Sequence, residues 1–198
     1  MAIQTPLQTV PQDKTWTYDD YAALPDDGNR YEVIEGELVM APAPRVSHQR
    51  CSGNLYFILR QHVESHRLGE VLAAPCDVVL DKRNVLQPDL IFISNARAEV
   101  VTELNLQGAP DLAVEILSPS SLRRDRVQKM RIYARHGVPH LWLIDAQART
   151  LEEFVLDGST YRLASTGEGD ETFHPALFPG LDIPLKEVWG QPIPEQKP

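Results

Sequence analysis

A carboxylate inside an otherwise apolar run is the feature that most constrains how this chain can fold. Glu115 is the only charged residue of Leu112–Leu117, a run with the length and composition of a strand covered on both faces. Burying a carboxylate without a compensating cation or hydrogen bonds is unfavourable by several kcal/mol. We therefore expect Glu115 to belong to a functional site at the centre of a sheet.

A second acid, Asp89, opens the apolar run Leu90–Ile93, which predicts another strand. If the two strands are neighbours, the side chains of Asp89 and Glu115 can converge. Two carboxylates and a main-chain carbonyl, for which we favour Ile116, are hard oxygen ligands of the kind that Mg²⁺ or Mn²⁺ prefers. The pattern therefore predicts a metal site formed by Asp89, Glu115 and Ile116.

A basic helix follows the strand of Glu115 directly. We predict it over residues 122–136, capped by Ser118–Ser121 and ended by Gly137. Helical spacing places four of its residues on one buried stripe: Val127, Met130, Tyr133 and Ala134. Opposed only by Asp125, six basic side chains lie within residues 123–135: Arg123, Arg124, Arg126, Lys129, Arg131 and Arg135.

The sequence leaves two interpretations of this helix open. In the first, Lys129 lies near the metal site and stabilises developing negative charge, while four arginines contact a nucleic-acid backbone, namely Arg123, Arg124, Arg126 and Arg131. In the second, the helix face is merely solvated. Lys129 then forms only an i to i+4 ion pair with Asp125, worth about 0.2–0.5 kcal/mol.

Composition sets limits on domain organisation and partners. With 198 residues, 42% of them hydrophobic, the chain can bury one core, so we expect a single domain over residues 15–189 between flexible ends at 1–14 and 190–198. A net charge of −9 argues against coating nucleic acid non-specifically, so any such contact must be local. No signal peptide or membrane span is recognisable, which predicts a cytoplasmic protein without membrane association.

Residue patterning predicts a mixed central β-sheet flanked by helices, in the α/β or α+β class. We expect a helix over residues 16–24, a hairpin over 31–40 and a helix over 47–66 that Ser47 caps. The expected strands span residues 70–81, 85–93, 111–117, 140–145, 150–156 and 160–166.

Motifs spread over most of the chain carry a family resemblance. They include Arg-Tyr-Glu-Val-Ile-Glu-Gly-Glu-Leu at 30–38, Gln-Pro-Asp-Leu-Ile-Phe at 87–92, Ala-Pro-Asp-Leu-Ala-Val-Glu-Ile-Leu-Ser-Pro-Ser at 109–120 and Leu-Trp-Leu-Ile-Asp at 141–145. Together with the basic helix they resemble the Uma-two family, whose fold belongs to the PD-(D/E)XK nuclease group. The resemblance implies a restriction-endonuclease-like sheet with an N-terminal hairpin and C-terminal strands.

The resemblance also implies functional roles. Asp89 and Glu115 correspond to the metal carboxylates of the family. The general nuclease pattern places a lysine where this chain has Leu117, and the family resemblance implies that Lys129 on the next helix takes that role.

Two further residues, Glu37 and His48, match the early motif of the family and are candidate accessories. The alternative is that both residues have only structural positions, Glu37 at the tip of a hairpin and His48 in the first turn of a helix.

The leading hypothesis from these residues is a Mg²⁺- or Mn²⁺-dependent endonuclease that hydrolyses DNA. We expect a homodimer, because cutting both strands needs two sites. Two alternatives stay open: a catalytically weak or inactive nucleic-acid-binding or regulatory domain that keeps the nuclease fold, and a purely structural dimer module without affinity for DNA. RNA stays open as a substrate.

Overall fold

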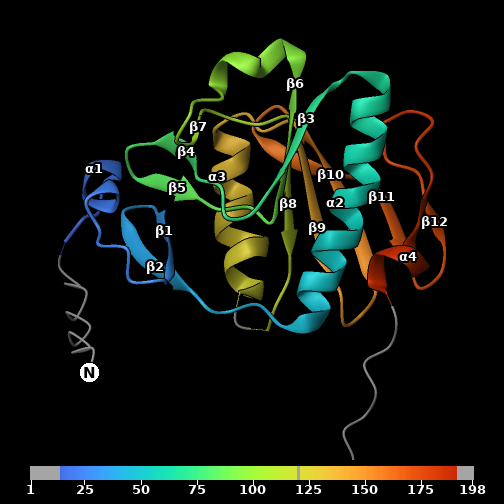
Figure 1. The fold of residues 1–198 in the computed structure, drawn as a ribbon, viewed down its shortest axis with the longest axis horizontal. Coiled ribbons are helices and arrows are strands. Elements are labelled where there is room, and N and C mark those ends of the chain that lie inside the picture. Colours follow the sequence, from blue (N-terminus) through green and yellow to red (C-terminus); the bar gives the residue numbers. More distant parts are fainter. Residues whose placement is uncertain (1–13, 120, 191–198) are drawn as a thin grey trace, which may run out of the picture.

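The computed structural model describes residues 14–119 and 121–190 (Figure 1). The flexible ends predicted for residues 1–14 and 190–198 therefore lie, except for Lys14 and Gly190, outside the described residues.

The elements alternate between short strands and a few helices. The first half of the described chain contains α1 (Tyr18–Ala22), β1 (Arg30–Ile34), β2 (Glu37–Ala41), α2 (Val46–His66), β3 (Gly69–Ala73), β4 (Val78–Asp81), β5 (Asn84–Leu86) and β6 (Leu90–Ser94). The second half contains the 3₁₀ helix η1 (Asn95–Val100), β7 (Leu106–Gln107), β8 (Leu112–Ile116), the π-helix η2 (Arg124–Lys129), α3 (Met130–Arg135), β9 (His140–Asp145), β10 (Thr150–Asp157), β11 (Thr160–Glu168), β12 (Thr172–Phe173), β13 (Ile183–Pro184) and α4 (Leu185–Trp189).

A six-stranded mixed sheet forms the centre of the fold, with strand order β11-β10-β9-β8-β6-β3. Strand β8 lies inside this sheet, antiparallel to β6 and parallel to β9. All five residues of β8 are buried, as its nearly continuous apolar sequence predicts. The predicted mixed sheet flanked by helices is thus confirmed.

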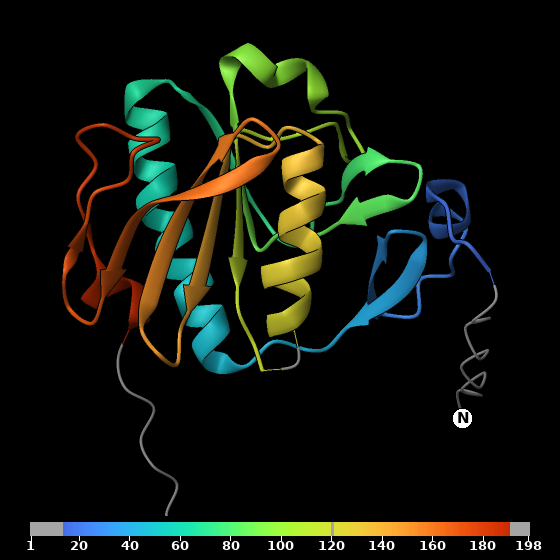
Figure 2. The same cartoon turned by 180° about the vertical axis from the view of Figure 1, so that it is seen from behind.

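Helices cover both faces of this sheet (Figures 1 and 2). On one face, α2 buries Cys51, Leu55, Leu59 and Val63 in a cluster with alternate residues of β8. On the other face, α3 buries Ile132 and Tyr133 against the remaining residues of β8 and against β9. Because side chains alternate along a strand, Glu115 projects to the α3 side.

A second sheet of five strands packs beside α3, with strand order β2-β1-β5-β4-β7. Ile34 of β1 and Leu86 of β5 belong to the same buried cluster as Ile132 of α3 and Leu141 of β9. Helix α3 therefore has the large sheet on one side and residues of the small sheet on the other.

The strands predicted over residues 70–81 and 85–93 are each divided into two. Strands β3 and β6 pair in the large sheet, whereas β4 and β5 pair in the small one. The divisions fall at Pro75 and Pro88, since proline has no N–H for a sheet hydrogen bond. The chain uses these breaks to pass from one sheet to the other.

The predicted basic helix forms, but its phase differs from the prediction. Val127 is exposed, while Asp125 and Lys129 are buried in its place. The reason is the π-helix η2, in which the amide of Met130 donates to the carbonyl of Asp125 five residues earlier. An α-helical period assigns the wrong residues to the buried side of such a turn.

The predicted cap of α2 is also wrong by two residues. Arg45, not Ser47, is the residue that precedes the helix, and its side chain makes no capping hydrogen bond.

None of the helices in the described residues is long and apolar enough to cross a membrane.

Gly69 provides a test of the packing between β3 and β6. It has φ +152°, and a Cβ atom there would lie 2.0 Å from the carbonyl oxygen of Ile93. We expect Gly69→Ala to lower the free energy of unfolding by about 2–3 kcal/mol, because strain and a backbone clash combine. Urea denaturation measures the change.

Gly53→Ala is the matched control, since its Cβ would meet nothing within 4 Å on the exposed side of α2. It should raise the free energy of unfolding by about 0.5–1 kcal/mol. Equal effects of the two substitutions would contradict the register of β3 against β6.

Candidate functional site

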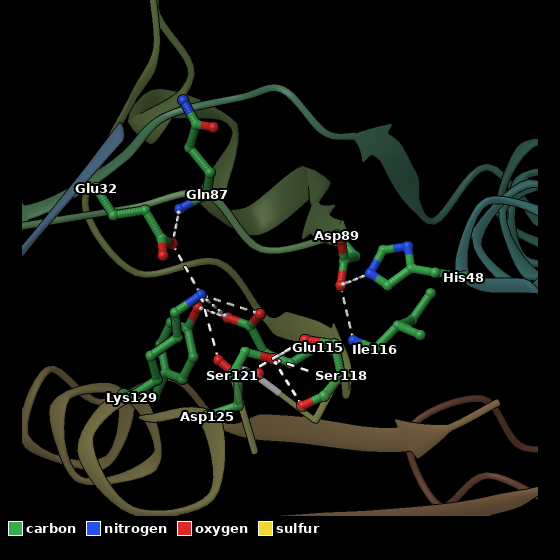
Figure 3. A network of polar contacts seen from close by, with 11 residues as sticks. Glu32, His48, Gln87, Asp89, Glu115, Ile116, Ser118, Ser121, Asp125 and Lys129 are labelled. Carbon is green, nitrogen blue, oxygen red and sulfur yellow. Dashed lines mark hydrogen bonds and ion pairs between the residues drawn. The ribbon is translucent and has the colours of Figure 1, made fainter. Parts of the chain in front are cut away.

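A cavity of about 300 Å³ lies where β1, the start of α2, the end of β8 and η2 meet. Figure 3 shows polar side chains from all of these elements directed toward one another. The ionisable groups that line it are Glu32, His48, Asp89, Glu115, Asp125 and Lys129, together with Arg30, Arg45 and Arg124.

The ammonium group of Lys129 is the centre of this network. Its Nζ lies 2.8 Å from Oε1 of Glu32, 3.1 Å from both carboxylate oxygens of Glu115 and 3.7 Å from Oδ1 of Asp125. The three acids come from β1, β8 and η2. Each of the four residues is at most 4% exposed, so this is a buried charge cluster.

Burial and charge act in opposite directions on Lys129. Burial alone would lower the pKa of its ammonium group, but the carboxylates of Glu115, Glu32 and Asp125 outweigh it and raise that pKa above the ordinary value. Lys129 is therefore a fixed cation at neutral pH and no proton acceptor.

The Glu115 carboxylate is held from two sides. Besides the contact with Lys129, Oε1 accepts a 2.6 Å hydrogen bond from the hydroxyl of Tyr133. Burial raises the pKa of Glu115 well above its ordinary value; Lys129 opposes this shift, and neighbouring acids such as Asp125 add to it. The site thus keeps a carboxylate in an environment that disfavours its charge.

Asp89 lies opposite Glu115 because β6 and β8 are neighbours, as expected from the sequence. Leu90 pairs with Val114, and Asp89 directly precedes Leu90. Its Oδ2 accepts a 2.7 Å hydrogen bond from the amide of Ile116 and lies 3.2 Å from Nε2 of His48. These two contacts fix the Asp89 side chain beside the start of β6 and the end of β8.

Glu32 is the acid from the small sheet. Its Oε1 accepts a 2.8 Å hydrogen bond from the main-chain amide of Gln87, in addition to the contact with Lys129. The small sheet therefore contributes directly to a site whose other acids belong to the large sheet and the π-helix (Figure 3).

Comparison with known proteins identifies the family of the chain. The family model described as "Uma2: Putative restriction endonuclease" matches residues 18–186. The chain belongs to the Uma2 family. Family membership supports a nuclease function.

A solved structure confirms the fold class of this Uma2 protein. The crystal structure of a putative nuclease belonging to DUF820 from Anabaena variabilis ATCC 29413 superposes with a TM-score of 0.71 at 20% identity. The match covers 87% of this chain and 97% of that one. No curated protein shows significant similarity to this chain.

The structure brings together part of the site predicted for this Uma2 protein. Asp89, Glu115, Lys129 and His48 all line the cavity, and the main chain of Ile116 meets Asp89 through its amide. A metal-ligand role for the Ile116 carbonyl stays a prediction.

Other predicted residues lie elsewhere. Glu37 is exposed on β2 and does not line the cavity. Among the four predicted phosphate-binding arginines only Arg124 lines it; Arg123 and Arg131 are exposed away from it, and Arg126 pairs with Glu152 of β10. One helix presents its residues in several directions, so a basic run cannot all face one ligand.

Sequence reasoning missed the roles of Glu32 and Tyr133. Glu32 precedes Val33 and Ile34 in a short strand, which is the same signal of an acid in an apolar run that identified Glu115. Tyr133 was predicted only as a core aromatic. No pattern in the sequence predicts that its hydroxyl donates a hydrogen bond to Glu115 of β8.

The donor chemistry of the cavity fits a divalent cation. The inner part of the cavity, away from the arginines of its lining, holds one lysine and four carboxylates, which leaves an excess of negative charge there: Glu32, Asp89, Glu115 and Asp125. Within the described residues, no three His, Cys, Asp or Glu side chains form a metal-binding group by themselves. We attribute this to Lys129, which lies among three of the acids, so that Asp89 and Glu115 would share the ion with water ligands.

Lys129→Met tests the charge cluster. The substitution leaves three buried carboxylates without their cation, so we expect the free energy of unfolding at pH 7 to fall by about 3–5 kcal/mol. Urea denaturation measures this loss. Arg131→Met, on the exposed side of the same helix, should change stability by no more than about 0.5 kcal/mol. Similar losses in both variants would contradict the cluster.

Asp125→Asn tests the burial of an acid by its pH dependence. Burial raises the pKa of Asp125 above its ordinary value of 3.8, against the opposing effect of Lys129. The folded state therefore binds the proton more tightly than the unfolded state, and this acid destabilises the fold progressively as the pH rises above 3.8. Asp125→Asn should thus gain stability relative to wild type between about pH 4 and pH 7.

Urea denaturation at several pH values in this range measures the difference. Asp157→Asn, which removes an exposed carboxylate at the end of β10, is the control and should give a nearly constant difference. A constant difference for Asp125→Asn as well would show that its carboxylate is not destabilised by burial.

Proposed function

We propose that this Uma2 protein is a cytoplasmic, Mg²⁺-dependent endonuclease that hydrolyses phosphodiester bonds of DNA. The observation that carries the proposal is that Asp89, directly before β6, and Glu115 of the neighbouring strand β8 line the same cavity, beside a buried lysine and in its acidic inner part. The family description supports the class of reaction.

The proposed reaction is hydrolysis. A water oxygen forms a bond to phosphorus as the bond from phosphorus to the leaving oxygen breaks; one proton of the water passes to solvent and the leaving oxygen takes up another. Mg²⁺ or Mn²⁺ held by Asp89 and Glu115, with Ile116 as a predicted main-chain ligand, would lower the pKa of a bound water and polarise the scissile phosphate.

Lys129 supplies positive charge that needs no rearrangement during the reaction. Glu32, Glu115 and Asp125 hold its ammonium group in place, and the raised pKa of Lys129 keeps it charged. A preorganised cation of this kind stabilises negative charge that develops on phosphoryl oxygens. Its role in the proposed mechanism is electrostatic, since an amine that is already protonated cannot take a proton from water.

One observation favours a second candidate, a catalytically inactive nucleic-acid-binding domain. Both carboxylate oxygens of Glu115 already contact Lys129, and Tyr133 donates to one of them. A site used only for binding would have the same contacts. A homodimer stays a prediction for either candidate.

Cleavage of supercoiled plasmid at low salt tests the proposed function. We expect nicking that depends on Mg²⁺ or Mn²⁺ and that falls by about 10²–10³-fold in Asp89→Asn, Glu115→Gln and Lys129→Met. Gel electrophoresis over time gives the rates, and circular dichroism confirms that each variant is folded.

Glu37→Gln is the matched control for the carboxylates, because Glu37 lies outside the cavity. It should nick at the wild-type rate. Nicking that survives both carboxylate substitutions would place the activity elsewhere, and no nicking by the folded wild-type protein with either metal would favour the binding domain.

A further inference from the structure

The side chains of three arginines that line the cavity have no ion pair or hydrogen bond with the described residues: Arg30, Arg45 and Arg124. Some arginines elsewhere on the acidic chain pair with carboxylates, as in Arg60–Glu64, Arg135–Glu35 and Arg149–Asp170. Others, such as Arg123 and Arg131, are exposed but do not line the cavity. Guanidinium groups left unpaired in a net-negative protein are available to an anionic ligand.

These arginines reach the cavity from three elements. Arg30 begins β1, Arg45 precedes α2 and Arg124 begins η2. They are half-buried or exposed, whereas the acids around Lys129 are buried. The cavity is therefore positive toward solvent and negative at its floor. This pattern fits a chain of phosphates bound at the arginines, one of which would approach the floor beside a divalent cation held there.

The depth of the cavity restricts the conformation of a nucleic acid whose phosphate can reach its floor. Glu115 is 3% exposed and Lys129 4% exposed, and the cavity of about 300 Å³ is at the small end of the range for ligand pockets. A duplex is stiff and carries its phosphates on a broad convex surface, whereas a single strand can bend into a narrow basic groove.

We propose that this site takes a single strand of nucleic acid, whose phosphates bind Arg30, Arg45 and Arg124 on either side of the phosphate at the floor. The inference rests on the proposed function for the identity of the reaction, but its binding part is independent of catalysis. Unpaired regions of a supercoiled plasmid are substrates of this kind.

The remaining walls indicate how selective the binding is. The segment Ala41–Pro44 lines one side with small side chains and prolines, and the described cavity lining contains no Phe, Tyr or Trp on which a base could stack. Affinity then comes mainly from phosphates, so binding is tolerant of sequence and strongly dependent on salt. One site suffices to cut a single strand, so activity on it does not require a dimer.

Fluorescence anisotropy with a labelled oligodeoxynucleotide of about 20 residues tests the proposal, with and without its complementary strand. In EDTA at low salt we expect the single strand to bind at least about tenfold more tightly than the blunt duplex. Arg30→Ala, Arg45→Ala and Arg124→Ala should each weaken binding of the single strand by about tenfold. Each should also reduce the slope of log affinity against log salt by about 0.7.

Arg131→Ala is the control, because it removes the same charge from the exposed side of the neighbouring helix and should leave both quantities unchanged. Equal binding of duplex and single strand, or an equal loss in Arg131→Ala and Arg124→Ala, would overturn the single-strand site. Cleavage of the same oligonucleotides with Mn²⁺ separates the two proposals. Tight single-strand binding without cleavage refutes only hydrolysis, whereas metal-dependent cleavage of the duplex at the single-strand rate refutes only the preference for one strand.

Discussion

A single buried ammonium group determines how the parts of this protein fit together. Lys129 contacts carboxylates from β1, β8 and η2, which belong to the small sheet, the large sheet and the helix between them. None of these four charges would be stable alone in such surroundings. Because the three carboxylates share this one cation, packing that separated either sheet from the helix would leave a buried charge unpaired.

The charge distribution of the protein acts on nucleic acid in opposite directions at long range and close to the cavity. The chain has a net charge of −9, so nucleic acid is repelled at long range and its attraction must come from short-range contacts in the cavity. For an enzyme that cuts nucleic acid, this arrangement limits accidental encounters with the bulk of the substrate. It favours binding of nucleic-acid strands whose conformation already allows them to enter the cavity.

Much of the site follows from the sequence, and what does not has identifiable physical causes. An acid in an apolar strand is detectable because its burial needs compensation, which identifies Asp89 and Glu115. Lys129 was a candidate because its basic helix follows the Glu115 strand, and the family resemblance assigned it the role of the nuclease lysine. The divided strands at Pro75 and Pro88 were missed because apolar composition does not reveal to which sheet a strand belongs. Arg30 and Arg45 were missed because only the three-dimensional arrangement brings residues from β1 and from the residue before α2 to η2.

The π-helix η2 has a consequence for insertions and deletions. A π-turn holds one residue more than an α-turn, and each residue of an α-helix turns the chain by about 100°. Loss of one residue between Arg124 and Lys129 would leave an uninterrupted α-helix in place of η2 and α3. Because the wider π-turn rotates the chain by less per residue, an α-helix with one residue fewer covers about the same rotation, so Arg124 would keep its direction relative to the part that holds Lys129 and Tyr133 against Glu115. An α-helical insertion would instead add about 100° of rotation between the two parts, so this segment tolerates a deletion better than an insertion.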